Sequence, residues 1–470
     1  MLQRKIIATA VALALAMPLA ARAAGDAELA QIREQIRQLK ESYETRIETL
    51  EKRLQEMETA ARRTGASVQT PKVAEAEAPA AQAPGRGSSE GAFNPAVSLV
   101  LAGAYGNLAR DPADYALTGF VPAGNGLSPG TRGLSLRETE LAIAANIDPD
   151  FRGTMLLSVD EANAAGIEEA YFQTLGLGNG ITLKGGRFLS ALGYQNEIHA
   201  HAWDFTDAPL VYRAFLAGDN YGDDGLQLKW LAPADTLIEL GGEIGRGKDR
   251  PGANRNKNGI ASGVLFAHLG GDIGDSHSYR VGVSALRTSP QNQLINDIDT
   301  RANSVTNAFS GNTRIAGADF VYKYAPNGNA RDTSFKLQGE FFQRRENGTL
   351  TYDTAGSGGL APSNVADSYA TSQSGWYLLG VYQFMPQWRI GLRFDRLDRG
   401  TVNIGAANLG NLQRYDYNPS RGSLMVDYSP SEFSRFRLQL GQDKSRQDAT
   451  GNQVFLQYIY SLGAHGAHKF

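Results

Sequence analysis

The 470-residue sequence predicts an all-β membrane barrel of about sixteen antiparallel strands, preceded by an N-terminal α-helical coiled coil. Three observations lead to this fold class. The chain begins with an export signal, most of its length alternates apolar and polar residues in short segments, and the last such segment ends on the aromatic Phe470. Period-2 alternation is typical of strands with one apolar face. In an exported chain it indicates a transmembrane, outer-membrane barrel rather than the edge of a soluble sheet.

Residues 1–23 have the features of a signal peptide. Arg4 and Lys5 supply its positive charge, and residues 6–17 are apolar but shorter than the roughly 20 residues that a membrane-spanning helix needs. Ala21 and Ala23 are small residues of the kind that a signal peptidase recognises, so we expect cleavage after Ala23. The chain contains no Cys. A closed barrel offers a source of stability other than disulfides, because its backbone polar groups are all paired between strands.

Residues 26–64 are predicted to form a periplasmic coiled coil. The segment is rich in Glu, Gln, Lys, Arg and Ala and contains neither Gly nor Pro. Its apolar residues recur at spacings of three and four, which is a heptad pattern: Leu29, Ile32, Ile36, Leu39, Tyr43, Ile47, Leu50, Leu54 and Met57. This stripe favours pairing with further copies of the chain, as a dimer or a trimer, over a lone helix lying on the barrel. Residues 65–90, rich in Ala, Pro, Glu, Gly and Ser, are predicted to be a flexible linker.

Residues 91–470 have the pattern of the barrel itself, in which alternating segments are separated by interruptions rich in Gly, Pro, Asn and Asp. Seven interruptions are short, near 147–150, 177–180, 232–235, 270–276, 326–332, 385–387 and 429–432. Eight are long, near 107–132, 161–166, 191–222, 248–258, 289–312, 347–374, 400–418 and 446–452. These interruptions predict sixteen strands. An even number places both ends of the barrel on the side of the short turns, which is the periplasmic side in outer-membrane barrels.

The alternation also predicts which charged residues face the lumen. The second half contributes mostly bases, for which we expect pore-lining roles: Arg280, Lys323, Lys336, Arg344, Arg389, Arg393, Arg435 and Arg437. The first half contributes acids: Glu138, Glu140, Asp160, Glu169, Glu239 and Glu243. Opposed walls of fixed charge would set up a transverse field that passes small polar solutes and slows apolar ones. The alternative is that these side chains pair locally within a wet interior.

The segment 191–222 is the most unusual of the predicted loops. An extracellular loop in water would not need this density of large apolar residues: Ile198, Trp203, Phe205, Leu210, Val211, Tyr212 and Phe215. Folded into the barrel, the loop would bury them against the wall and narrow the pore. Its charged residues would then line the constriction: Glu197, Asp204, Asp207 and Arg213. Packing on a neighbouring protomer is the alternative.

One pair of predicted strands and the residues that follow it carry a family resemblance. They read Ile167-Glu168-Glu169-Ala170-Tyr171-Phe172 and Leu183-Lys184-Gly185-Gly186-Arg187-Phe188, followed by Leu192-Gly193. This pattern resembles the phosphate-selective porin O/P family, which includes porins with an N-terminal coiled coil that take up small carboxylates. The resemblance implies a homotrimer in which each protomer forms its own pore. It also implies that Lys184 and Arg187 lie near the path of anions.

The charge balance departs from that family. Residues 91–470 contain 33 Lys and Arg against 37 Asp and Glu, whereas phosphate selectivity in the family depends on a ladder of bases. Distant charges are screened within about 10 Å at moderate salt, so a local basic track could still select anions. The overall balance does not predict strong phosphate selectivity.

The sequence thus predicts a porin for passive diffusion of small polar or anionic solutes, not an enzyme, in the outer membrane of a Gram-negative bacterium. The expected partners are outer-membrane lipid, further copies of the chain, the barrel-assembly machinery acting on the C-terminal strand, and the solutes. We expect no cofactor and no nucleic acid.

Two other protein classes stay open. A TonB-dependent receptor for zinc or a metal chelate would carry a plug inside a barrel of about 22 strands, and residues 26–90 leave no room for one. His199 and His201 are weak candidates for metal ligands, but we expect no metal site, because only Glu197 accompanies them in the sequence. An outer-membrane hydrolase would need a Ser or an acid held beside a His, and the six His show no clear pairing of that kind.

Overall fold

The computed structural model describes residues 95–120, 127–159, 164–216, 218, 220–247, 251–252, 258–356 and 363–463. The chain divides into a unit of residues 1–89 and a unit of residues 90–470, and every described residue belongs to the second unit. The predicted signal peptide, coiled coil and linker, and the terminal Phe470, lie outside the described residues. Within these described ranges, no helix is both long and apolar enough to cross a membrane.

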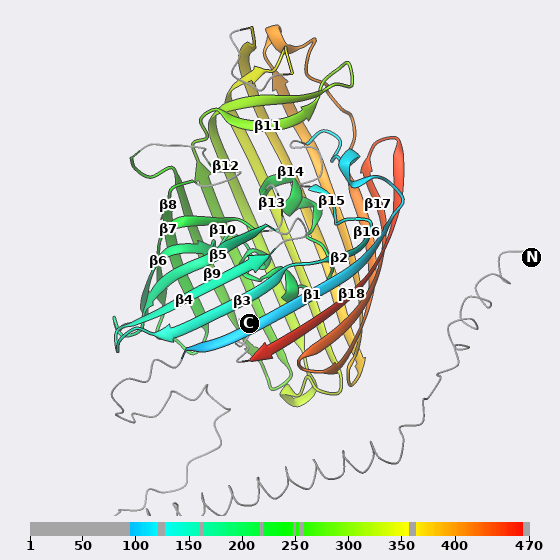
Figure 1. Ribbon diagram of the computed structural model, residues 1–470. Helices are drawn as coiled ribbons and strands as arrows, with labels where there is room; N and C mark the ends of the chain where they lie inside the picture. Colours follow the sequence, from blue (N-terminus) through cyan, green and yellow to red (C-terminus); the bar gives the residue numbers. More distant parts are fainter. Residues whose placement is uncertain are drawn as a thin grey trace, which may run out of the picture. The chain divides into compact units, whose positions relative to one another are not determined.

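Eighteen strands form one sheet that closes on itself (Figure 1). The first nine are β1 (Ala96–Leu108), β2 (Gly133–Leu136), β3 (Thr139–Asn146), β4 (Phe151–Val159), β5 (Ala165–Thr174), β6 (Ile181–Leu189), β7 (Gly222–Leu231), β8 (Leu237–Gly245) and β9 (Ser262–Ile273). The others are β10 (His277–Thr288), β11 (Gln293–Ile298), β12 (Ser304–Tyr324), β13 (Ser334–Tyr352), β14 (Val365–Met385), β15 (Trp388–Ile404), β16 (Ser420–Ser431), β17 (Ser434–Arg446) and β18 (Ala449–Gly463). Single 3-10 turns lie at η1 (Pro112–Asp114), η5 (Pro326–Gly328) and η6 (Ala406–Asn408).

These strands occupy sixteen positions around the barrel, which confirms the predicted antiparallel barrel of about sixteen strands. β2 and β3 both pair with β1 and share one position. β10 and β11 both pair with β12 and share another, and each remaining strand has a position of its own. The ring closes between β1 and β18, from Ser98 opposite Gly463 to Leu108 opposite Gln453. Because neighbouring strands are antiparallel and the ring is closed, the wall can pair its backbone groups without an open edge.

The seven short turns lie close to their predicted places, between β3 and β4, β5 and β6, β7 and β8, β9 and β10, β12 and β13, β14 and β15, and β16 and β17. The long loops differ more. The predicted loop near 446–452 is a turn of residues 447–448 between β17 and β18. Much of 289–312 and 347–374 is strand, because β12, β13 and β14 continue to 21, 19 and 21 residues, beyond the roughly 9–11 that cross a bilayer.

The outer face of the wall is apolar along strands whose inner face is charged. In β15, Leu392 is 64% exposed and its neighbour Arg393 only 3%. In β17, Phe436 and Leu438 are exposed and Arg437 is buried. Aromatic residues near the short turns also point outward: Phe151, Trp230, Tyr324, Phe384 and Trp388. An apolar band bordered by aromatic residues is the surface that an outer-membrane barrel presents to lipid.

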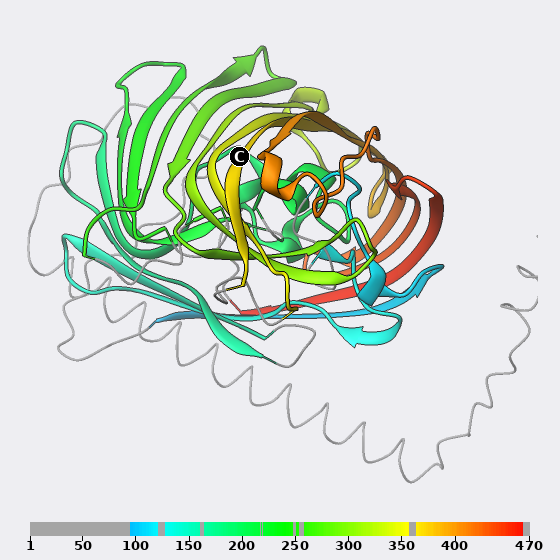
Figure 2. The same ribbon diagram turned by 90° about the horizontal axis from the view of Figure 1, so that it is seen from above.

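The interior of the barrel is filled on one side. Seen along the barrel, the segment between β6 and β7 lies within the ring of strands (Figure 2). Its apolar side chains form one buried cluster with inward residues of the wall, including Leu286, Phe342 and Tyr377. The largest buried apolar cluster among the described residues is therefore a contact between the wall and the internal segment, and the place of this segment decides where open space remains in the barrel.

Candidate functional site

The internal segment comprises residues 190–221, which we call the inner loop. It contains η3 (Gln195–Glu197), η4 (Ala200–Ala202) and the short helix α3 (Leu210–Leu216). Every residue of α3 is buried. The ring of Tyr212 meets that of Phe342 edge-on with 5.6 Å between centroids. The apolar residues that made this segment unusual in the sequence are therefore the ones that attach it to the wall.

The two ends of the inner loop are tied to each other and to the wall. The Asn196 side chain donates from Nδ2 to the carbonyl oxygens of Ser190 at 2.7 Å and Tyr221 at 2.8 Å. Glu243 of β8 accepts hydrogen bonds from the Ser190 hydroxyl at 2.6 Å and the Ala191 amide at 2.9 Å. These bonds satisfy backbone groups that leave the sheet, as a buried loop requires.

Glu340 of β13 holds the first turn of the inner loop. It accepts hydrogen bonds from the Gln195 amide at 2.8 Å, the Tyr212 hydroxyl at 2.9 Å and the Tyr377 hydroxyl at 2.6 Å. Gly193 approaches the same carboxylate with a φ of +80°, and a Cβ there would lie 2.2 Å from Glu340 Oε2. Only glycine allows both the backbone angle and the approach.

Asp207 is the most deeply buried of the acids that the structure describes in the inner loop. It forms ion pairs with Arg421 and with Arg393, whose Nη2 lies 2.8 Å from Asp207 Oδ1, and it accepts a hydrogen bond from Gln439 at 2.9 Å. Arg393 also contacts Asp395 at 3.0 Å. Burial by itself would raise the pKa of Asp207, but the two guanidinium groups outweigh it and hold the pKa below its usual range.

Asp204 forms a second charged contact between the inner loop and the wall. It pairs with Lys336 and, at 3.1 Å, with Arg389. Arg389 also pairs with Asp427 of β16, which Arg437 contacts at 2.7 Å. Burial would raise the pKa of Asp204, but Lys336 and Arg389 outweigh it and lower the pKa below its usual range. Asp204 is thus charged at neutral pH and offsets part of the basic wall.

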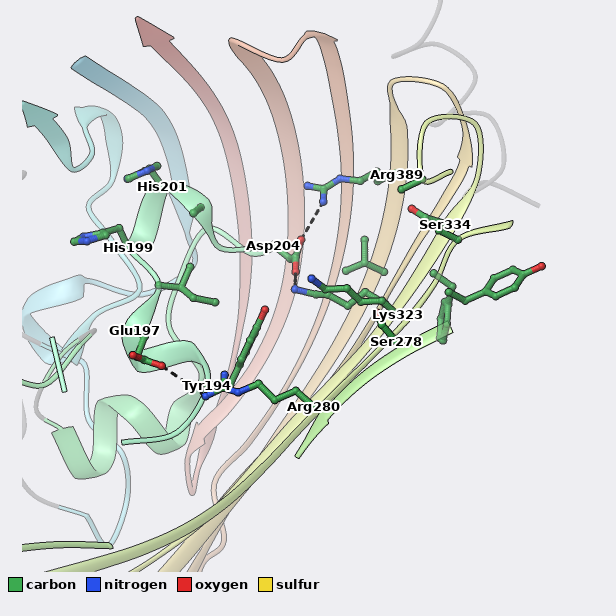
Figure 3. A pocket seen from close by; sticks show the side chains of 18 of the residues that line it. Tyr194, Glu197, His199, His201, Asp204, Ser278, Arg280, Lys323, Ser334 and Arg389 are labelled. Carbon is green, nitrogen blue, oxygen red and sulfur yellow. Dashed lines mark hydrogen bonds and ion pairs between the residues drawn. The ribbon is translucent and has the colours of Figure 1, made fainter. Parts of the chain in front are cut away.

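Between the inner loop and the wall lies a polar cavity of about 1030 Å³ (Figure 3). It extends to the short-turn end of the barrel, where Asp275, Ser276 and Ala330 line it. Ten of the charged residues expected at the pore line this cavity: Lys184, Arg280, Lys323, Lys336, Arg389, Arg435, Glu140, Glu169, Glu197 and Asp204.

The charges around this cavity are unevenly distributed. Figure 3 shows His199 and His201 on one side and Lys323 and Arg389 on the other. The basic side is built by β10, β12, β13, β15 and β17, and the acidic side by β3, β5 and the inner loop. Arg280 reaches across to the loop, with its Nη2 3.6 Å from Glu197 Oε2.

Several residues expected at the pore do not line this cavity. Arg344, Arg393, Arg437, Asp207 and Arg213 are at most 4% exposed and anchor the inner loop or one another. Arg344, for example, donates to the Ala214 carbonyl at 2.9 Å, and Arg213 donates to the Leu127 carbonyl at 2.6 Å. Glu138, Glu239 and Glu243 face inward but contact other side chains, and Asp160 lies outside the described residues. Period-2 alternation along the strands predicted that the strand residues among them face inward, but it could not predict that the inner loop or other side chains would cover them.

Arg187 is on the opposite face of the wall from the cavity. Lys184 lines the cavity, so the odd-numbered neighbours in β6 face outward, and Arg187 lies opposite the outward Ala170. Its guanidinium contacts Asp224 of β7, with Nε 2.6 Å from Oδ1. Lys184 therefore lines the cavity and Arg187 does not, and a role of either residue near the path of anions stays a prediction.

The acidic side of the cavity holds a compact group of carboxylates and imidazoles. His199 Nδ1 lies 3.2 Å from Glu168 Oε1 and 3.7 Å from Glu140 Oε1, and His199 Nε2 lies 3.1 Å from Glu169 Oε2. His201 Nδ1 lies 2.9 Å from Glu140 Oε1. Burial would lower the pKa of His199, but its hydrogen bonds to the two glutamates outweigh it and raise the pKa well above 6.5.

Sequence reasoning missed one wall residue at the anchor of the inner loop. Arg421 is 1% exposed and contacts Asp207 and the Ala208 carbonyl, and it shares β16 with Asp427, which is fully buried between arginines. The signal was present, because Arg421, Ser423, Met425 and Asp427 alternate along β16 and are all buried.

A closed antiparallel barrel of sixteen positions, apolar outside and charged within, is an outer-membrane β-barrel of the porin type. The chain belongs to the same family as an uncharacterized protein of Aquifex aeolicus (strain VF5). The two are 30% identical over 415 residues, which is 81% of each chain. No family model matches the sequence.

Several solved structures are similar to this chain in fold. OmpT of Vibrio cholerae in its trimer form has a TM-score of 0.48 at 10% identity and covers 78% of this chain and 99% of its own. An anion-selective porin from Comamonas acidovorans has a TM-score of 0.46 at 11% identity, covering 78% and 99%. The outer-membrane channel DcaP of Acinetobacter baumannii has a TM-score of 0.45 at 12% identity, covering 80% and 99%.

Proposed function

We propose that this protein is a passive outer-membrane channel for small polar solutes, with a preference for anionic ones, narrowed by the inner loop. The observation that carries the proposal is the charged cavity between the loop and the wall, which reaches the short-turn end and is lined by opposed acidic and basic side chains. A wet, charged passage admits solutes that keep part of their hydration and hydrogen bonds, and it disfavours apolar ones.

The anion preference rests on the bases that line the cavity. Arg393 and Arg437 are neutralised by buried aspartates, and Asp204 offsets Lys336 and Arg389. Lys323 and Arg435 also line the cavity, and Arg435 Nε lies 3.9 Å from Asp427 Oδ2. Bases that line the cavity attract anions locally. The transverse field between the acidic and basic walls is smaller than expected from the sequence, because buried aspartates neutralise several of the arginines.

A single engineered cysteine tests whether the cavity belongs to the conducting path. The chain has no Cys, so a thiol reagent can act only at the introduced residue. In Ser278→Cys, whose side chain lines the cavity, we expect a charged, water-soluble methanethiosulfonate to reduce single-channel current in planar bilayers. Leu265→Cys is the control, because Leu265 lies on the outer face at 70% exposure and would be covered by lipid. Full current in modified Ser278→Cys would contradict the proposal.

Selectivity should follow the cavity bases rather than the buried ones. The double variant Lys323→Gln/Arg435→Gln is expected to shift the reversal potential in a salt gradient toward cations. The reason is that a charge about 4 Å from an ion contributes up to about 4 kcal/mol at an effective dielectric of 20. Arg399→Gln is the control for the loss of one positive charge away from the cavity, because Arg399 is 40% exposed and pairs with Asp416. Equal reversal potentials in the double variant and the wild type would contradict the assigned basic track.

The proposal also covers the oligomeric state and the family of this protein, which the described residues do not establish. A homotrimer, each protomer with its own pore, and a periplasmic coiled coil at residues 26–64 stay predictions, as do recognition of the C-terminal strand by the barrel-assembly machinery and a Gram-negative host. Kinship with the phosphate-selective porin O/P family is supported by the sequence of β5 and β6 and by the inner loop that follows them.

A further inference from the structure

Four side chains on the acidic side of the cavity converge on one point. Glu138 precedes β3, Glu140 belongs to β3, Glu168 belongs to β5, and His199 belongs to the inner loop. One ligand atom from each of the four lies within 4.8 Å of the others. The group therefore joins two strands of the wall to the loop, and it combines three carboxylates with one imidazole.

Two oxygens of this group have no hydrogen-bond donor among the described residues. Glu138 Oε2 and Glu168 Oε2 are shielded from solvent and unpartnered. Carboxylate oxygens gathered this closely repel one another, and a cation bound among them would relieve that repulsion.

The surrounding side chains are arranged as supports for ligands. His199 presents Nδ1 to Glu168 and Glu140, and its opposite nitrogen, Nε2, lies 3.1 Å from Glu169. Glu169 is itself held by the Leu189 amide at 2.9 Å. A carboxylate that accepts the second N–H of a ligating histidine orients the ring and raises its basicity, and this pairing is typical of metal centres.

We propose that Glu138, Glu140, Glu168 and His199 bind one divalent first-row transition-metal ion, with Zn²⁺ as its test ion. Ligands of a tetrahedral Zn²⁺ at 2.0–2.2 Å lie about 3.4 Å apart, and the His199 distances of 3.2 Å and 3.7 Å to Glu168 and Glu140 fit that spacing. Imidazole favours transition metals over Mg²⁺ and Ca²⁺. Glu140 and His199 line the cavity, which gives the ion a route to the site.

This metal site goes beyond the proposed channel function, because binding of the ion does not depend on passage of solutes through the channel. It ties the inner loop to β3 and β5, on the side of the cavity opposite the contacts of Asp204 with Lys336 and Arg389. A bound ion would also reduce the negative charge on the acidic side of the cavity.

Calorimetric titration of the purified, folded full-length chain with ZnCl₂ tests this proposal. All variants carry His465→Asn and His468→Asn, so that the C-terminal histidines do not contribute. We expect one Zn²⁺ per chain. His199→Ala should weaken the affinity about 100-fold or more and Glu169→Gln by about 10-fold, as losses of a ligand and of its supporting partner do.

His268→Gln is the matched control. His268 also faces a carboxylate, with Nδ1 3.0 Å from Glu239 Oε1, but it is not part of the four-residue group. The His268→Gln variant should bind Zn²⁺ with the same affinity as the background chain, which carries only His465→Asn and His468→Asn. Unboiled gel mobility reports whether each variant is folded. Absence of stoichiometric binding to the folded background chain, unchanged affinity in folded His199→Ala, or an equal loss in His268→Gln would each overturn the site. None of these outcomes depends on conductance, so they leave the channel proposal to its own tests.

Discussion

Replacing Asp207 with asparagine is expected to lower the free energy of unfolding by about 3–5 kcal/mol, the usual effect of removing one partner from a buried ion pair. Arg393 and Arg421, which share this carboxylate, are 3% and 1% exposed. Asn keeps the shape and can still accept the hydrogen bond from Gln439, so the loss would be one of charge. Urea titration of the barrel folded in detergent micelles measures the change, and limited proteolysis reports release of the inner loop.

The control is an ion pair on the surface. Arg399 and Asp416 are in contact, but their side chains are 40% and 91% exposed. Asp416→Asn should change the free energy of unfolding by about 1 kcal/mol or less, since exposed pairs contribute little. If Asp207→Asn has an effect as small as that of Asp416→Asn, the buried arginines do not depend on Asp207 and the inner loop is held by its apolar contacts alone.

A chain lacking residues 197–205 is expected to show about twice the single-channel conductance, because conductance follows the open cross-section at the narrowest point. The deletion removes Glu197, His199, His201 and Asp204, which all border the cavity. It also leaves Lys336 and Arg389 without the charge of Asp204, so anion preference should increase at the same time. Bilayer recordings in symmetric and graded KCl measure both effects.

Replacing the same nine residues by glycine and serine distinguishes two effects of the inner loop on conductance: the space that the loop fills and the contacts that hold it to the wall. It keeps the length of the inner loop but removes the contacts of Glu197 and Asp204 with the wall. We expect a conductance between those of the wild type and the deletion, with larger current fluctuations. Wild-type conductance in the deletion would mean that residues 197–205 do not border the conducting path.

The direction of a side chain in this wall could be read from the sequence. In β15, Leu392 and Phe394 are exposed and Arg393 and Asp395 are buried, as period-2 alternation predicts. The reason is local: successive side chains of an extended chain point to opposite faces, whatever the neighbouring strands are. The same reasoning identified the seven short turns and the sixteen positions, because turn residues interrupt the pattern at each end of a strand.

The fate of an inward charge could not be read in this way. Arg393 and Arg389 share a strand and a face, yet Arg393 is enclosed by Asp207 and Asp395 while Arg389 borders the cavity. The difference comes from the inner loop, almost two hundred positions earlier in the sequence. Its path depends on where its aromatic residues find space against the wall.

The sequence by itself determined the barrel, the inward and outward faces of its strands and the segment that folds into it, because these follow from local periodicity and from apolar residues that need burial. The tertiary structure alone decided the cavity and the convergence of Glu138, Glu140, Glu168 and His199. These residues come from two strand regions and a loop, and their distances depend on the register of β3, β4 and β5 and on the anchors of the inner loop. Registers and anchors are long-range contacts, and no periodicity along one chain encodes their geometry.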